Sequence, residues 1–172
     1  MLFRTCCFNI YLLAALLSLL AGGCTTPPKE GKRAESALRL HLEVNPHPAT
    51  QSTRVTVGRS ASLVLNVDSQ AFLTELQVDK ASVIDALGGF AIALQFNSDG
   101  AILLEQFTTA YKGRRMAIAA EFGELRWIAA PVIRQRLAEG QLVFTPDLTR
   151  EEADRFVRGL NRVAELVRKG RK

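Results

Sequence analysis

Cysteine is nearly absent from this chain of 172 residues. The only three, Cys6, Cys7 and Cys24, lie within the first 24 residues. The body of the protein can therefore form no disulfide, offer no cysteine nucleophile and ligate no metal through sulfur. Charge is also modest: 22 Lys and Arg residues against 17 Asp and Glu give a formal net charge of +5. This is too small and too evenly spread to indicate nucleic acid as a partner.

Histidine is almost as scarce, with only His41 and His47. Even with neighbouring Glu43 they supply too few converging ligands for a metal site, and we expect solvent-facing strand and turn residues. No nucleophile-elbow sequence is present. The sequence therefore predicts a protein that is not an enzyme and holds no metal or cofactor. A hydrolase would require Ser, His and carboxylate groups to cluster in three dimensions.

The apolar run near the N-terminus, Ile10 to Ala21, is shorter than the roughly 20 residues that a spanning helix needs. Small residues and Cys24 follow it. This ending resembles the lipobox of bacterial lipoproteins, in which the signal is cut before the cysteine and the cysteine is acylated. We expect residues 1–23 to be a lipoprotein signal peptide and Cys24 to carry the lipid. An ordinary secretory signal cut nearby and an uncleaved anchor are the alternatives.

Residues 24–36 are polar and interrupted by Pro27, Pro28 and Gly31, which is typical of a flexible tether. The lipobox resemblance implies a protein anchored by acyl chains such as palmitate, in the bacterial cell envelope and facing the periplasm. In enteric bacteria an Asp after the cysteine retains a lipoprotein in the inner membrane. Thr25 at that position favours the outer membrane.

Short strands bounded by glycine and proline dominate the body of the chain. Residues 37–44 alternate, with Leu38, Leu40 and Leu42 on one face and polar residues on the other. Reversals are expected at Gly58, at 88–89 and at 122–123, and Pro131 ends a strand. The predicted strands are 37–44, 54–57, 62–67, 80–85, 90–96, 114–121, 125–130 and 141–144.

Two amphipathic helices are predicted. The first begins at Ser98, a suitable N-cap, and ends near Gly113. The second follows Thr149, which forms a capping box with Glu152. The order of elements from residue 80 predicts an α+β fold, a mostly antiparallel sheet with both helices on one face. The apolar stripe of the second helix comprises Ala153, Phe156, Val157, Leu160, Val163, Ala164 and Val167.

A series of motifs between residues 90 and 162 occurs in a distinctive order and spacing. These motifs are Phe90–Phe96, Asp99-Gly100, Phe107-Thr108-Thr109, 113–118 (GRRMAI), 130–133 (APVI), Gly140, Phe144-Thr145 and Glu151-Glu152-Ala153. The segment resembles the head subdomain of the first periplasmic domain of SecD, a subunit of the preprotein translocase. Residues 72–85 fit less closely and 37–67 hardly at all. We therefore expect an N-terminal strand region at 37–71 and a SecD-head-like domain at 72–172.

The resemblance implies a module that contacts exported, unfolded polypeptide or another envelope protein. SecD usually has an Asp-Gly turn between the paired strands, where this chain has Glu121-Phe122-Gly123-Glu124. No membrane-spanning segment is expected after the domain, so the proton-driven part of SecD has no counterpart here. The expected function is non-catalytic binding on a lipid anchor. A module for small molecules or anions is the alternative.

Four residues near a strand end are candidates for interaction: Trp127, Pro131, Ile133 and Arg134. The apolar members pack in the core, or they form an apolar ledge at a sheet edge that accepts an extended peptide by strand addition.

Arg155, Arg158 and Arg162 recur at helical spacing, and Arg168, Lys169, Arg171 and Lys172 follow. They form a solvated helix face, or they contact anionic lipid headgroups or an acidic partner. The carboxylates Asp147, Glu151, Glu152 and Asp154 surround the start of the same helix, where the helix dipole favours negative charge, so we expect them to cap it. Ser98-Asp99-Gly100 could hold an anion in the same geometry, but the start of a helix is enough to explain these three residues.

Overall fold

The structure, a computed structural model, describes residues 36–46, 51–59 and 62–170. These residues belong to one compact unit. The predicted signal peptide, Cys24, nearly all of the tether and His47 lie outside the described residues. No helix in the described ranges is long and apolar enough to cross a membrane.

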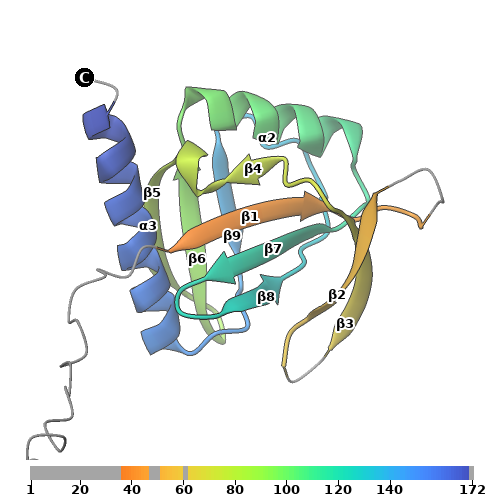
Figure 1. The fold of residues 1–172 in the computed structure, drawn as a ribbon, viewed down its shortest axis with the longest axis horizontal. Coiled ribbons are helices and arrows are strands. Elements are labelled where there is room, and N and C mark those ends of the chain that lie inside the picture. The colour runs from red at the N-terminus through yellow and green to blue at the C-terminus, as the bar shows by residue number, and fades with distance from the viewer. Residues whose placement is uncertain (1–35, 47–50, 60–61, 171–172) are drawn as a thin grey trace, which may run out of the picture. The chain divides into compact units, whose positions relative to one another are not determined.

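The fold is α+β, as the sequence predicts, and all of its strand pairs are antiparallel in the described residues (Figure 1). The alternating segments form strands, and the capped amphipathic segments form helices. The elements are β1 (Ala37–Leu42), β2 (Ser52–Val57), β3 (Leu63–Asp68), β4 (Leu73–Thr74), η1 (Glu75–Gln77), β5 (Val78–Ala86), β6 (Gly89–Phe96), α2 (Ser98–Ala110), β7 (Met116–Glu121), β8 (Leu125–Ala129), β9 (Gln141–Phe144) and α3 (Arg150–Gly170).

The strands divide among three sheets instead of forming one. The orders are β4-β1-β7-β8, β2-β3 and β5-β6-β9. In Figure 1, β5, β6 and β9 cross steeply behind β1 and β7. The inward side chains of both larger sheets, such as Leu40 and Ile118 facing Ile92 and Leu94, are in one hydrophobic core. β1 pairs with β7 along its whole length, so strands from both sides of the predicted boundary at 71/72 share a sheet.

The capping box at the start of α3 is confirmed. The Thr149 N–H donates to Glu152 Oε2 at 2.8 Å, and the Glu152 N–H donates to Thr149 Oγ1 at 3.2 Å. The Thr149 N–H lowers the pKa of the Glu152 carboxyl below its usual range, and nearby Arg126 adds to this effect. The N-cap of helix α2 lies one residue earlier in the chain than predicted. Its N-cap is Asn97, not Ser98, because the extended backbone of Asn97 lets its Oδ1 accept from the Gly100 N–H at 2.9 Å.

Helix α3 covers the outer edge of β5. The Asn161 side chain accepts a hydrogen bond from the Ala81 N–H at 2.8 Å and donates one to the Ala81 carbonyl at 2.9 Å. The apolar stripe faces inward, as predicted: Ala153, Phe156, Val157, Leu160 and Ala164 are buried. One edge of the three-stranded sheet is thus closed by a helix.

Candidate functional site

His41 is buried, so the prediction that it faces solvent is wrong. Only 8% of its surface is exposed, because the β2–β3 hairpin packs across the outer face of β1 and β7. Its Nδ1 lies 2.8 Å from the Asp68 carbonyl oxygen, and its ring meets Trp127 edge to face at 5.1 Å. Burial lowers the pKa of His41 below its ordinary value of 6.5. This environment is typical of a packed histidine.

His41 has a main-chain hydrogen-bond partner. In the described ranges it makes no hydrogen bond to a serine hydroxyl or a carboxylate, and the nearby Ser69 hydroxyl is bonded to Thr53 at 3.0 Å. Within the same ranges, no group of three or more His, Cys, Asp or Glu residues is placed to hold a metal ion.

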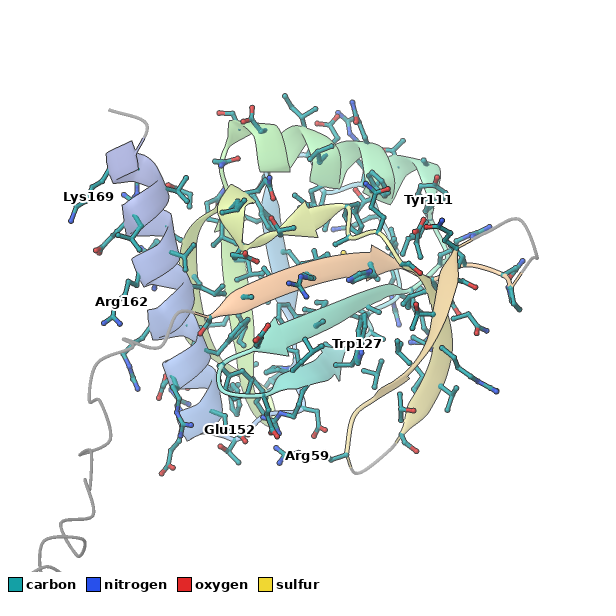
Figure 2. All side chains as sticks on the ribbon, viewed as in Figure 1. Arg59, Tyr111, Trp127, Glu152, Arg162 and Lys169 are labelled. Atoms are coloured by element: carbon teal, nitrogen blue, oxygen red, sulfur yellow. The ribbon has the colours of Figure 1, made fainter. Side chains whose placement is uncertain are left out.

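Trp127 is half-buried beneath the same hairpin, against the cluster of Val55, Val57, Leu65 and Val67 (Figure 2). The free side of β8 is partly occupied at this point. The Gly58 N–H donates to the Trp127 carbonyl at 3.2 Å, and the Asp147 N–H donates to the Ile128 carbonyl at 2.7 Å. The carbonyl oxygens of Trp127 and Ile128 are therefore already hydrogen-bonded and are not free to accept from a guest strand.

The carboxylates near the start of α3 form an ion-pair network with arginines of other elements. Glu152 meets Arg126 at 2.9 Å and Arg59 at 3.0 Å, and the Arg59 main chain donates to Asp147. Arg59 and Glu152 lie together at the foot of α3 in Figure 2. Because Thr149 and Asn97 already cap the two helix starts, neither start is available as a simple anion site.

The second edge of the three-stranded sheet, along β9, is open. The Phe96 N–H donates to the Gly140 carbonyl at 2.9 Å, and the register continues through Leu94 with Leu142. Because bonded and non-bonded pairs alternate in an antiparallel ladder, Gln141 and Val143 turn their N–H and C=O groups away from β6. No hydrogen bond from outside the ladder reaches these groups in the part of the chain that the structure describes. The Val143 side chain is 54% exposed.

The segment 131–137, which connects β8 to β9, is held beside this open edge. The Pro131 carbonyl accepts from the Met116 N–H at 3.0 Å, and the Ile133 N–H donates to the Arg114 carbonyl at 2.8 Å. Further along, the Leu137 N–H donates to Thr108 Oγ1 at 3.0 Å. These bonds hold the segment between β7 and α2.

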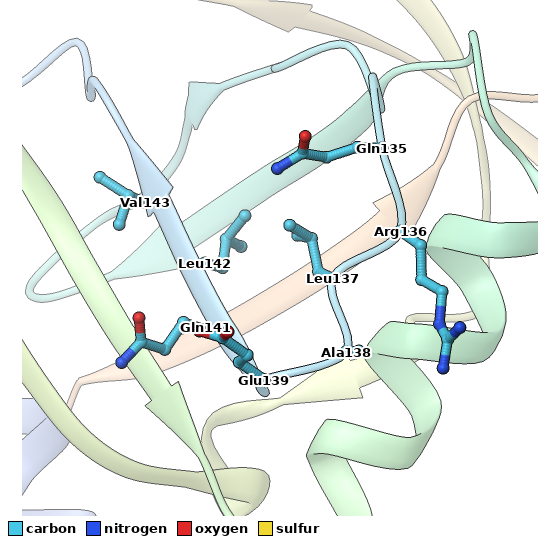
Figure 3. A pocket seen from close by; sticks show the side chains of 8 residues that line it. All are labelled: Gln135, Arg136, Leu137, Ala138, Glu139, Gln141, Leu142 and Val143. Carbon is cyan, nitrogen blue, oxygen red and sulfur yellow. The ribbon is translucent and has the colours of Figure 1, made fainter.

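Two adjoining cavities lie between this segment and β9. One, of about 330 Å³, is flanked by the apolar side chains of Pro131, Ile133 and Leu142. The other, of about 490 Å³, has Leu137 and Leu142 side by side at its centre (Figure 3). We call the combined hollow the β9 groove. Its lining is mixed: Pro131, Val132, Ile133, Leu137, Leu142 and Val143 are apolar, Arg134, Gln135, Arg136, Glu139 and Gln141 are polar, and Thr108, Met116 and Ala138 complete it.

The groove unites only some of the residues that the sequence singled out. Pro131, Ile133 and Arg134 line it, with Ile133 buried and Arg134 exposed. Trp127 lies under the hairpin instead, and Arg155, Arg158 and Arg162 lie on α3. Sequence reasoning missed Leu137 and Val143. Val143 has the one usable signal, because it is an apolar residue at an outward position of a short strand.

The sequence matches the family described as SecDF, P1 head subdomain, over residues 50–164. A search of curated proteins gives no match. A solved structure titled as a membrane component SecDF that enhances protein export is similar in fold, with a TM-score of 0.54 and 22% identity. That match covers 74% of this chain and 63% of the other.

Two further SecDF structures match more weakly. One is a super-membrane-facing form, with a TM-score of 0.48 and 16% identity over 92% of this chain and 33% of that one. The other is a translocon-associated membrane protein from Thermus thermophilus, with a TM-score of 0.42 and 18% identity over 91% and 34%. These two likenesses are too weak to bear on the fold.

Proposed function

Since the chain belongs to the family of SecDF P1 head subdomains, we propose that it is a non-catalytic protein-transport module that binds extended polypeptide at the β9 groove. The observation that carries this proposal is the open edge of β9 beside a hollow that is apolar where Pro131, Ile133 and Leu142 line it. A related protein is described as enhancing protein export, and a chain in export is an extended polypeptide.

The chemistry of the edge suits strand addition. A guest strand beside β9 would hydrogen-bond to the outward N–H and C=O groups of Gln141 and Val143, each bond contributing about 1 kcal/mol. Alternate guest side chains would then point to opposite faces of the sheet. One set would enter the cavity between Ile133 and Leu142, which favours apolar side chains at every second position. Arg134, exposed at the rim, would meet the main chain or an acidic side chain of the guest.

Lipid anchoring is the second part of the proposal. Residues 1–23 are a lipoprotein signal peptide, Cys24 carries the acyl chains, residues 24–36 are a tether, and residues 37–71 and 72–172 form the body. The apolar run and the small residues before Cys24 support this. The protein is then anchored in the outer membrane of the cell envelope and faces the periplasm. Metabolic labelling with a palmitate analogue tests it: wild type should be labelled and Cys24→Ala should not, and equal labelling would contradict it.

In-cell photo-crosslinking tests the polypeptide site. A photoreactive amino acid is placed at Val143, at Arg134 or, as a control, at Arg54, which is exposed on β2. We expect many different exported chains to be captured from the first two positions and none from Arg54. Capture of a single folded envelope protein would identify a dedicated partner instead. Identical patterns at all three positions, or no adduct at Val143, would contradict the groove.

A further inference from the structure

Three arginines of α3 pair with no carboxylate among the residues that the structure describes. Arg155, Arg158 and Arg162 make none of the ion pairs found across the described ranges. Other arginines of the same helix differ: Arg150 pairs with Asp85, and Arg168 lies 3.9 Å from Asp79. The three are thus distinguished from their neighbours by the absence of any such pairing.

These arginines share one side of the helix. At 3.6 residues per turn, positions 155, 158, 162 and 169 fall within an arc of about 60°. The opposite side is buried in the core, so this arc is fixed outward, and Figure 2 shows Arg162 and Lys169 pointing away from the sheets. We call Arg155, Arg158, Arg162 and Lys169 the α3 basic face.

Acidic and apolar residues border this face. Glu151 lies within it, and Glu165 and Asp154 lie at one margin, so the basic side chains are in excess but not alone. Leu166, 51% exposed, lies one turn beyond Arg162 and one turn before Lys169 on the helix surface. Guanidinium groups with an exposed leucine suit the boundary between phosphate headgroups and acyl chains, since Arg binds phosphate oxygens through paired donors.

The N-terminal end of the described chain packs on α3 next to the basic face. A Cβ built on Gly159 would be 2.0 Å from Ser36 Oγ and 2.9 Å from the Ser36 nitrogen, so Ser36 is packed on the helix between Arg155 and Arg162. Cys24 precedes Ser36 by 12 residues. A chain of that length reaches about 40 Å at most. A lipid at Cys24 would therefore keep α3 close to the membrane.

We propose that the α3 basic face docks on anionic lipid headgroups of the membrane that carries the protein. The inference rests on the proposed anchor only for the nearness of that membrane. Docking also sets the orientation of the module. Because α3 closes the β5 edge and the strand order is β5-β6-β9, the β9 groove would lie on the side away from α3, open to the periplasm.

The test uses the full chain reconstituted in vesicles, with a fluorophore on Leu166→Cys. Cys6 and Cys7 are replaced by serine, the thiol of Cys24 is blocked by its acyl chain in the anchored protein, and the body has no other cysteine. The vesicles contain phosphatidylcholine alone or with phosphatidylglycerol, and both carry a headgroup nitroxide lipid that quenches the fluorophore. We expect strong quenching only in the anionic vesicles, and its loss at high salt.

The decisive variant is Arg155→Gln/Arg158→Gln/Arg162→Gln. Each arginine should shift the docking equilibrium about fivefold, and the three together roughly 100-fold. Arg39→Gln/Arg54→Gln/Lys80→Gln removes the same charge from exposed strand positions and should quench like wild type.

Equal quenching in both kinds of vesicle, or an unchanged triple α3 variant, would overturn the proposal. If the chain floats with the vesicles but its fluorophore is quenched in neither kind, docking is contradicted and the anchor is not. The arginines would then be available to bind an acidic protein. A chain that floats with neither contradicts both docking and the anchor.

Discussion

The Asn161 side chain hydrogen-bonds to both main-chain polar groups of Ala81, accepting from its N–H at 2.8 Å and donating to its C=O at 2.9 Å. A side-chain amide thereby takes the place of a neighbouring strand at the edge of β5. Unpaired strand edges invite pairing with other chains. The protein closes this edge with α3 and leaves the β9 edge of the same sheet open.

Removing the two hydrogen bonds between Asn161 and Ala81 should destabilise the fold. In Asn161→Ala the partly buried N–H and C=O of Ala81 lose their partners, which costs about 1–3 kcal/mol. The free energy of unfolding in urea measures it. Arg158→Ala, on the outer side of the same helix, should stay within about 0.5 kcal/mol of wild type. Equal midpoints for the two variants would show that the β5 edge does not depend on Asn161.

Gly159 should tolerate no side chain, although it lies within a helix. Gly→Ala in a helix interior usually adds about 1 kcal/mol of stability. Here the new Cβ would lie 2.0 Å from Ser36 Oγ and 2.9 Å from the Ser36 nitrogen, and the main chain would have to move. We expect Gly159→Ala to lose about 1–3 kcal/mol in urea unfolding.

Two controls accompany Gly159→Ala. Adding Ser36→Gly removes the hydroxyl contact but not the main-chain one, so it should restore part of the loss. Gly170→Ala, where the added Cβ meets nothing within 4 Å, should be close to neutral. A stabilised Gly159→Ala would mean that Ser36 does not pack on α3.

His41 should make stability depend on pH. Burial lowers its folded-state pKa below 6.5, so between the two pKa values the unfolded chain binds the extra proton. Stability therefore rises with pH up to about 6.5 and falls as the medium becomes more acidic. Urea midpoints across this window should show a smaller change in His41→Gln, whose amide can still donate to the Asp68 carbonyl. His47 is present in both proteins, so any contribution from it cancels in the comparison. Parallel pH profiles would contradict the burial of His41.

Much of the local structure is readable from the chain because its signals are local. β9 has the predicted bounds, and the Thr149–Glu152 capping box forms as expected. The predicted N-cap of α2 is wrong by one residue because Asn and Ser are both favourable N-cap residues. The extended backbone of Asn97, which the sequence does not show, makes Asn97 the N-cap.

What the sequence could not supply is which faces and edges become covered. Alternation assigns His41 correctly to the face opposite Leu40, but a hairpin distant in sequence covers that face too. The same limit applies to the site. Pro131 and Ile133 stood out as an apolar ledge, yet the strand edge beside them is β9, and its openness follows from the sheet order. Strand pairing is a long-range outcome that periodicity does not encode.

The central claim is that the outward main chain of β9 binds an extended polypeptide. Val143→Pro removes one outward N–H while leaving the ladder bonds to β6 intact, which an edge strand tolerates. Val143→Ala keeps that N–H and is the matched control. The probe is a fluorescein-labelled peptide of alternating valine and threonine, and binding to the full chain is followed by fluorescence anisotropy.

We predict that wild type and Val143→Ala bind the peptide and that Val143→Pro, with an unchanged circular dichroism spectrum, weakens binding at least about tenfold, which is 1.4 kcal/mol. Binding by Val143→Pro that equals binding by Val143→Ala would contradict strand addition at β9.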